Sequence, residues 1–108
     1  MLFRSRSAFE RALAANPQSA QAQAGLAMIA LRSGRTDEAI EGWTKAVAMD
    51  PTNYDALYNL GIQLVRAGRI ADARPYRERF IATAPPGHYS RDILDMRAML
   101  AKLEGGRR

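Results

Sequence analysis

Apolar residues recur along the chain at intervals of three and four positions, which is the spacing of one face of an α-helix. In residues 2–16 this stripe consists of Leu2, Phe9, Ala12 and Leu13, and it ends before Pro17. Such a stripe buries one side of a helix and leaves the other side in water. The pattern therefore predicts a first amphipathic helix over residues 2–16.

The same periodicity predicts further helices, separated by glycine and proline. Gly34 is expected to end one of them in the left-handed conformation that glycine adopts without strain. Thr36 is expected to cap the next helix, with Asp37 and Glu38 near its positive end. These further helices are expected at residues 20–33, from residue 36 onward, and at 54–67, 71–83 and 90–103.

The sequence repeats itself with a period of 34 residues. A fixed period of this length indicates a stacked array, because each unit is a helical hairpin that cannot bury its apolar face alone. Before the first complete unit, Phe9 aligns with Trp43 and Pro17 aligns with Pro51. The two complete units align Leu26 with Leu60, Arg32 with Arg66, Gly34 with Gly68, Arg35 with Arg69, Ala39 with Ala73, and Pro51 with Pro85.

The residues at the repeated positions resemble the tetratricopeptide repeat motif. The resemblance implies an all-α fold, a right-handed superhelical stack of antiparallel helix hairpins, built as a single domain over residues 1–108. It also implies a packing role for Trp43, since the family uses this position for packing. The residues that carry the motif are Leu26, Gly34, Ala39, Trp43, Ala46 and Pro51 in one unit and Leu60, Gly61, Gly68, Ala73 and Pro85 in the next.

The resemblance divides the chain into partial and complete units. An uncovered apolar end is a solubility problem for such an array. The first unit lacks its first helix, which leaves two alternatives: a longer array, or an end that a second copy covers. The expected parts are the second helix of a truncated repeat at residues 2–17, repeats at 20–53 and 54–87, a capping helix at 88–104 and a flexible tail at 105–108.

The second unit departs from the motif in its second helix. Pro75 removes a backbone donor and is expected to bend the start of this helix. Arg77 stands where the first unit has Trp43. The apolar stripe of this helix is therefore expected to be rotated, and to consist of Ala73, Tyr76, Phe80 and Ala84.

Composition narrows the class of protein. The chain has 108 residues, of which 47% are hydrophobic, and this suffices for one extended core. The absence of cysteine excludes a disulfide framework, a thiolate zinc site and a cysteine nucleophile. No apolar run approaches the roughly 20 residues of a membrane span, and arginines interrupt the apolar start, unlike a signal peptide. The compartment stays open, with the cytoplasm as the default expectation.

The charge raises nucleic-acid binding as a hypothesis, because the net charge is +5 and the pI is about 10.2. However, the basic residues are interleaved with acidic ones, and no aromatic and basic motif of a known reader is present. Helical repeats that read RNA also need many more units. Nucleic acid therefore ranks last among the partner classes.

Candidate catalytic residues are few. The one histidine, His88, lies in a predicted turn without partners at close spacing, so we interpret it as a solvated loop residue. The serines have no neighbouring base or glycine-rich elbow, and the glycines form no phosphate loop. We expect no enzymatic activity, no cofactor and no metal.

The family's first helices line a concave groove that commonly takes a peptide or a partner helix. By register with the motif, the outer candidates for this groove are Gln21, Ala24 and Gly25, and the last helix is expected to add Tyr89, Ile93, Met96 and Met99. The main candidates are Met28, Leu31 and Arg32 from the first unit and Asp55, Tyr58, Asn59, Ile62, Val65 and Arg66 from the second.

The pair Arg32 and Arg66 has two interpretations. Each arginine falls in the last turn of a predicted helix, where a cation interacts favourably with the helix dipole. Alternatively, the pair binds a carboxylate or an acidic side chain of a partner. Relatives that bind the terminal carboxylate of a chaperone tail use lysines, asparagines and an arginine at further positions of the groove. Only one of these positions is matched here, by Asn59. We therefore expect no binding of such tails.

Three functions follow from this surface. The leading hypothesis is a protein-protein interaction scaffold that binds a peptide or helix, including one with acidic groups, in the concave groove. The alternative is self-association into a homo-oligomer through the exposed ends of the array. Nonspecific nucleic-acid binding is the third, and no membrane partner is expected.

Overall fold

The computed structural model describes residues 2–105 of the chain, with side chains described for residues 6–102. In this part of the chain all regular structure is helical, which confirms the all-α class. The helices are α1 (Leu2–Ala15), α2 (Ala20–Arg32), α3 (Thr36–Met49), α4 (Tyr54–Arg66), α5 (Ile70–Thr83) and α6 (Pro86–Gly105).

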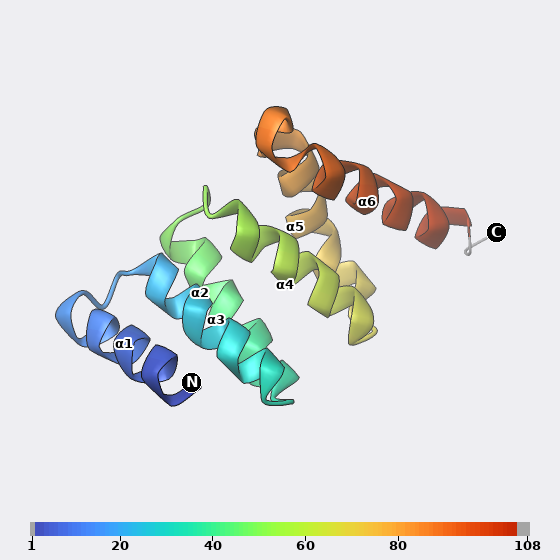
Figure 1. Cartoon of the computed structure of the whole chain (residues 1–108). Helices are drawn as coiled ribbons and strands as arrows, with labels where there is room; N and C mark the ends of the chain where they lie inside the picture. Colours follow the sequence, from blue (N-terminus) through green and yellow to red (C-terminus); the bar gives the residue numbers. More distant parts are fainter. Residues whose placement is uncertain (1, 106–108) are drawn as a thin grey trace.

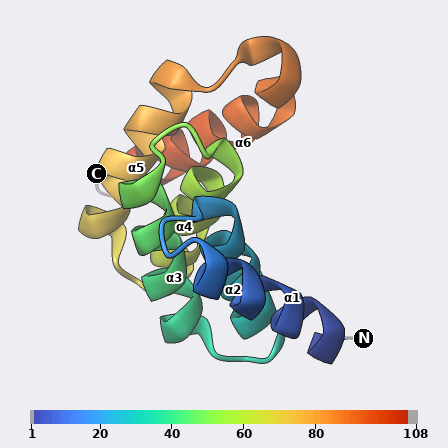
Figure 2. The same ribbon diagram turned by 90° about the vertical axis from the view of Figure 1, so that its left-hand side faces the viewer.

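The helices stack one after another along the chain, so that each packs mainly on its sequence neighbours (Figure 1). The view after a 90° turn shows the same progression from α1 at one end to α6 at the other (Figure 2). The molecule is elongated, with extents of 48 × 29 × 23 Å. The pairs α2–α3 and α4–α5 are the two helical hairpins of the repeat. None of the described helices is long and apolar enough to span a membrane.

The ends of the helices repeat from unit to unit. The Ser19 hydroxyl accepts a hydrogen bond from the backbone N–H of Ala22 at 3.2 Å. Asn53, which lies 34 residues later, accepts one from Ala56 at the same distance. At the other end, Gly34 and Gly68 have φ of 80° and 79°, in the left-handed region where glycine is favoured.

The predicted cap of α3 is wrong. Thr36 is the first helical residue, and Arg35 occupies the N-cap position without a side-chain hydrogen bond to the helix. The reason is the short turn, in which Arg35 N–H already donates to Ala30 C=O at 2.8 Å. That bond closes α2 and brings the chain directly into α3. Asp37 and Glu38 do lie in the first turn of α3, as predicted.

Among the described side chains, the core runs from α2 to α6. Trp43 is only 1% exposed, and small residues around it allow close helix approach, because a Cβ on Gly42 would lie 2.9 Å from the Cβ of Ala27. The largest fully buried side chains are Trp43, Arg77, Phe80, Leu57, Leu60, Leu64 and Met96.

Helix α5 and its C-cap residue bury three residues of the predicted stripe, Ala73, Phe80 and Ala84, and differ from the prediction at one position. Arg77 is 1% exposed and replaces Tyr76, which is only partly buried, in the buried stripe with Ala73 and Phe80. A Cβ on Gly61 would lie 3.0 Å from Cγ of Arg77, so the arginine stem packs directly against α4. The helix continues through Pro75.

Helix α6 begins earlier than the predicted capping helix. Pro86 is its first residue, a position where proline is favoured because its missing N–H needs no partner there. Non-helical angles at Tyr89 (φ −111°, ψ 22°) then kink the helix. His88 consequently lies in a helical turn, exposed, with its ring 4.6 Å from that of Tyr89. Gly105 belongs to α6, and the rest of the predicted tail lies outside the described residues.

Candidate functional site

Two stripes of partly exposed apolar side chains lie on the first helices of the two repeats. Each stripe packs against the core and still leaves part of its surface accessible. Residues four and then three positions apart share one face of a helix, so each set forms a continuous row. The rows are Ala24, Met28 and Leu31 on α2 and Tyr58, Ile62 and Val65 on α4, related by the 34-residue repeat.

Arg32 and Arg66 lie at the end of these rows, each in the last turn of its helix. Both side chains are exposed. Among the described residues, neither guanidinium has a hydrogen bond or ion pair with another side chain. Both are therefore available to an acceptor that approaches from outside the chain.

The start of α4 carries polar groups beside the apolar row. Asn59 donates one side-chain N–H to the Asp55 carbonyl at 2.9 Å, so its side-chain oxygen and its second N–H are left for a partner. The ring of Tyr58 packs on Phe80 with centroids 5.3 Å apart. Burial raises the pKa of Tyr58, and the carboxylates Asp92 and Asp95 of α6 raise it further. The charge of Arg66 acts on this pKa in the opposite direction. Negative charge of α6 thus lies near Tyr58 in this row.

Several predicted groove residues belong elsewhere. Gly25 is covered by Phe9 of α1, because a Cβ at this position would lie 2.6 Å from Cε2 of that ring. Ile93 and Met96 are part of the core, and Met96 is completely buried. The reason is that α6 turns this face toward α4, where the Met96 methyl group would be 3.4 Å from a Cβ on Gly61. The proposed peptide-binding residues are therefore those of α2 and α4.

One aromatic contact was missed at the sequence level. The rings of Tyr54 and Tyr89 meet edge to face at 5.7 Å, and Tyr89 packs in the same way on Phe80. Burial, followed by the charge of Asp55, raises the pKa of Tyr89. The sequence does place a tyrosine near the start of both α4 and α6. However, it does not reveal the kink at Tyr89 that brings the two rings into contact.

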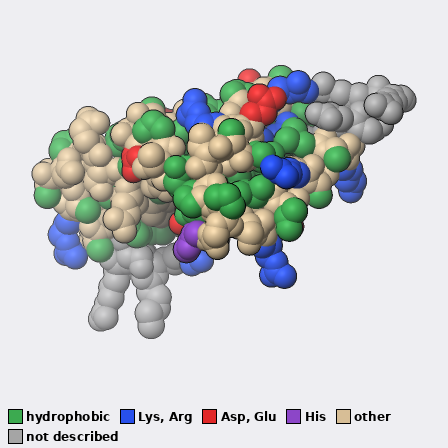
Figure 3. Space-filling model, turned by 90° about the horizontal axis from the view of Figure 1, so that it is seen from above, with side chains coloured by type: hydrophobic (Ala, Val, Ile, Leu, Met, Phe, Trp, Pro, Cys, Tyr) green, Lys and Arg blue, Asp and Glu red, His purple; other side chains and the backbone are tan. Residues whose placement is uncertain are grey.

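The charged groups form neither a metal site nor one continuous basic surface on the face in view. Among the described residues, no group of three or more His, Cys, Asp or Glu side chains could hold a metal ion. In Figure 3 hydrophobic side chains gather over the middle of the molecule, while Lys and Arg side chains are scattered around them with acidic ones between. This distribution suits contacts with a protein better than contacts with a run of phosphates.

Comparisons with known proteins agree with this architecture. The family model described as "Tetratricopeptide repeat" matches residues 4–43 and 29–88. Among solved structures, the chain is similar to the type III secretion translocator chaperone SycD of Yersinia enterocolitica, with a TM-score of 0.85 and 15% identity. The likeness covers 98% of this chain and 74% of SycD. At this identity it is a likeness of fold. No curated protein matches the chain.

Proposed function

Because the chain belongs to the tetratricopeptide repeat family, we propose that this interaction scaffold binds a short segment of a partner protein across α2 and α4. The observation that supports this proposal is the pair of half-buried apolar rows, which occur at the same repeat positions on both helices. A partner segment that lies across them would cover Met28 and Ile62 at the centre and Leu31 and Val65 beside the arginines.

The apolar rows supply most of the expected affinity. Covering about 300 Å² of apolar surface stabilises a complex by about 7 kcal/mol at 25 cal/mol per Å². The loss of translational freedom and the ordering of the segment oppose part of this gain. Binding is therefore expected to be weaker than 1 μM, which corresponds to about −8 kcal/mol. Met28 adapts to different side chains because methionine is flexible and polarizable.

The arginines give the proposed partner its charge. Arg32 and Arg66 have no ion-pair partner among the described side chains, so each can receive a carboxylate in a bidentate contact. A contact of this exposed kind contributes about 0 to 1 kcal/mol. The arginines thus set the orientation and selectivity of an acidic segment more than its affinity.

The test is selection from a displayed library of random peptides on the full chain, followed by anisotropy titrations of the enriched sequences. We expect peptides with apolar residues and at least one acidic residue. Ile62→Glu should weaken their binding more than tenfold, and Arg66→Glu should weaken the acidic ones several-fold. The matched control is Arg74→Glu, which reverses an exposed arginine of α5.

Unchanged melting temperatures must accompany these losses, so that they report binding. The proposal fails if Ile62→Glu binds the peptides as tightly as the unaltered chain does. It also fails if Arg74→Glu weakens binding as much as Arg66→Glu, since the arginine effect would then be one of net charge.

A further inference from the structure

The apolar row of α4 has opposite charges at its two ends. Asp55 lies in the first turn of this helix and Arg66 in the last turn. Eleven positions separate these two residues, which corresponds to about 16 Å along the axis of an α-helix. The side chains of Tyr58, Ile62 and Val65 lie between them. A partner segment that follows this row therefore meets a carboxylate at one end and a guanidinium group at the other.

Helix α6 adds a carboxylate to the Asp55 end of the row. Tyr89 of α6 packs its ring against the ring of Tyr54, the first residue of α4, with the centroids 5.7 Å apart. Burial raises the pKa of Tyr89, and the charges of Asp55 and Asp92 raise it further. After burial, the charge of Asp92 acts in the same direction on the pKa of Tyr58. Asp55 and Asp92 thus lie beside one group of tyrosine rings, and these two carboxylates define the acidic end of the groove.

These carboxylates are not neutralised by a basic side chain. Within the described residues no ion pair involves Asp55, Asp92 or Asp95, although Arg91 lies only four positions before Asp95. No cation of the described residues acts on the pKa of Tyr89. The helix dipole explains an acidic residue in the first turn, such as Asp55. It does not explain Asp95, which lies beyond both the start of α6 and the kink at Tyr89.

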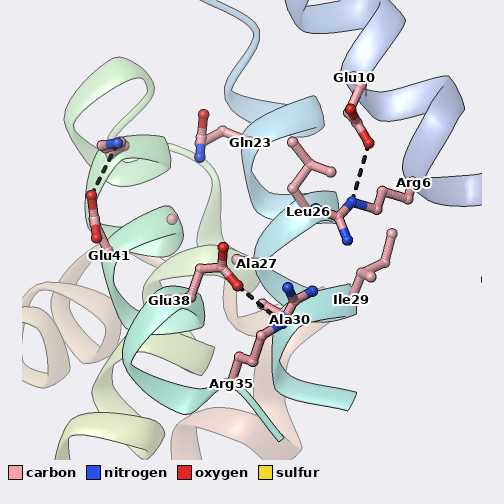
Figure 4. A pocket seen from close by; sticks show the side chains of 12 residues that line it. Arg6, Glu10, Gln23, Leu26, Ala27, Ile29, Ala30, Arg35, Glu38 and Glu41 are labelled. Carbon is pink, nitrogen blue, oxygen red and sulfur yellow. Dashed lines mark hydrogen bonds and ion pairs between the residues drawn. The ribbon is translucent and has the colours of Figure 1, made fainter. Parts of the chain in front are cut away.

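A hollow over α2 shows the contrast with a surface that is balanced in charge. It has a volume of about 330 Å³ and lies between α1 and α3 (Figure 4). Each of the three cations that line it pairs with one of the three glutamates that line it. The pairs are Arg6 with Glu10, Arg35 with Glu38, and Lys45 with Glu41. The hollow therefore favours neither sign of charge in a ligand, whereas the acidic end of the groove favours a cation.

We propose that the acidic end of the groove binds a basic side chain of the partner segment, between Asp55 of α4 and Asp92 of α6 and beside the ring of Tyr58. This inference rests on the proposed function, because the apolar residues of the segment must lie along α2 and α4. Arginine fits this end better than lysine, since its planar guanidinium binds carboxylates bidentately and stacks on aromatic rings. The distance of about 16 Å to Arg66 corresponds to about five residues of extended chain. The expected segment therefore has an arginine and an acidic residue about five positions apart, with apolar residues between them.

The test uses four labelled peptides and anisotropy titrations of the full chain. The peptides GSRLALVEGS and GSEVLALRGS place the two charges about five positions apart in the two chain directions. In the other two peptides citrulline replaces the arginine, which keeps the shape of the side chain and removes its charge. In at least one direction, the arginine peptide should bind about three- to tenfold more tightly than its citrulline form.

Variants of the chain assign this difference to the acidic end. The double variant Asp55→Asn, Asp92→Asn keeps the shape of both side chains and should bind the arginine and citrulline peptides equally. The matched control is the double variant Asp37→Asn, Glu78→Gln, which removes two exposed carboxylates of α3 and α5 and should keep the difference. Melting temperatures should be unchanged in both variants.

The inference is overturned if the citrulline peptides bind as tightly as the arginine peptides. It is also overturned if the control variant loses the difference, since the effect would then be one of net charge. Ile62→Glu keeps these failures apart from failure of the proposed function. A citrulline peptide that binds the unaltered chain and not the Ile62→Glu chain supports the proposed function even where arginine adds nothing. If none of the four peptides binds, this inference fails, and the selection from random peptides still decides the proposed function.

Discussion

The contact between α1 and α2 depends on a single glycine, and this makes a sharp prediction for Gly25→Ala. The new methyl group would lie 2.6 Å from Cε2 of the Phe9 ring, closer than carbon atoms approach in proteins. The ring must therefore leave its place. Replacing glycine with alanine inside a helix contributes about 1 kcal/mol of stability by itself, whereas overpacking costs about 1 to 3 kcal/mol. We expect Gly25→Ala to be neutral or to destabilise the chain by up to about 2 kcal/mol.

Without the Phe9 ring, Gly25→Ala should raise the free energy of unfolding instead of leaving it unchanged or lowering it. In a Phe9→Ala background nothing opposes the helical preference of alanine, so Gly25→Ala should stabilise the chain by about 1 kcal/mol. The free energies of unfolding come from urea titrations of the four chains, followed by circular dichroism. A coupling of about 1 to 3 kcal/mol between the two positions is expected for residues in contact. A coupling below about 0.5 kcal/mol would refute the reasoning, since it would mean that α1 does not rest on this glycine.

Other perturbations test the core, the turns, the tyrosines and the predicted selectivity. Trp43→Ala should cost about 3 to 5 kcal/mol in urea unfolding, a large part of the roughly 5 to 15 that stabilises a domain. Gly34→Ala should lower the melting temperature because φ is 80° there, while Gly87→Ala, which meets no atom within 4 Å, should not. The raised pKa values of Tyr58 and Tyr89 favour their neutral forms in the folded chain, so stability should fall as pH rises above 10.0, the ordinary pKa of tyrosine. The fall should be smaller in the double variant Tyr58→Phe, Tyr89→Phe. A free peptide that ends in EEVD should show no micromolar binding by anisotropy.

The 34-residue repeat made most of the fold predictable. Identical spacing of small residues, glycines and prolines predicted the helices and the left-handed turns at Gly34 and Gly68. The caps Ser19 and Asn53 were missed although they obey the same offset. The signal was present, because both are preferred capping residues directly before a predicted helix.

Other features depend on packing that the repeat does not encode. Arg77 aligns with Trp43, but its charge argued against a buried position, and only the tertiary structure shows its stem against Gly61. Pro86 reads as a breaker in the sequence and instead starts a helix. The hollow of about 330 Å³ between α1 and α3 depends on how α1, α2 and α3 are placed relative to one another. These features depend on which faces of neighbouring helices pack together, and local sequence preferences do not determine that packing.

The placement of basic residues favours a role for the proposed groove beyond the helix dipole. A cation in the last turn stabilises any exposed helix by about 0.3 to 1 kcal/mol, regardless of which side of the array the helix lines. Dipole stabilisation alone would therefore serve α3 and α5 as well as α2 and α4. In the structure α3 and α5 have no basic residue in the last turn, whereas α2 ends with Arg32 and α4 with Arg66. The arginines thus occur where the apolar rows of α2 and α4 end, which is the arrangement expected if both bind the same acidic segment.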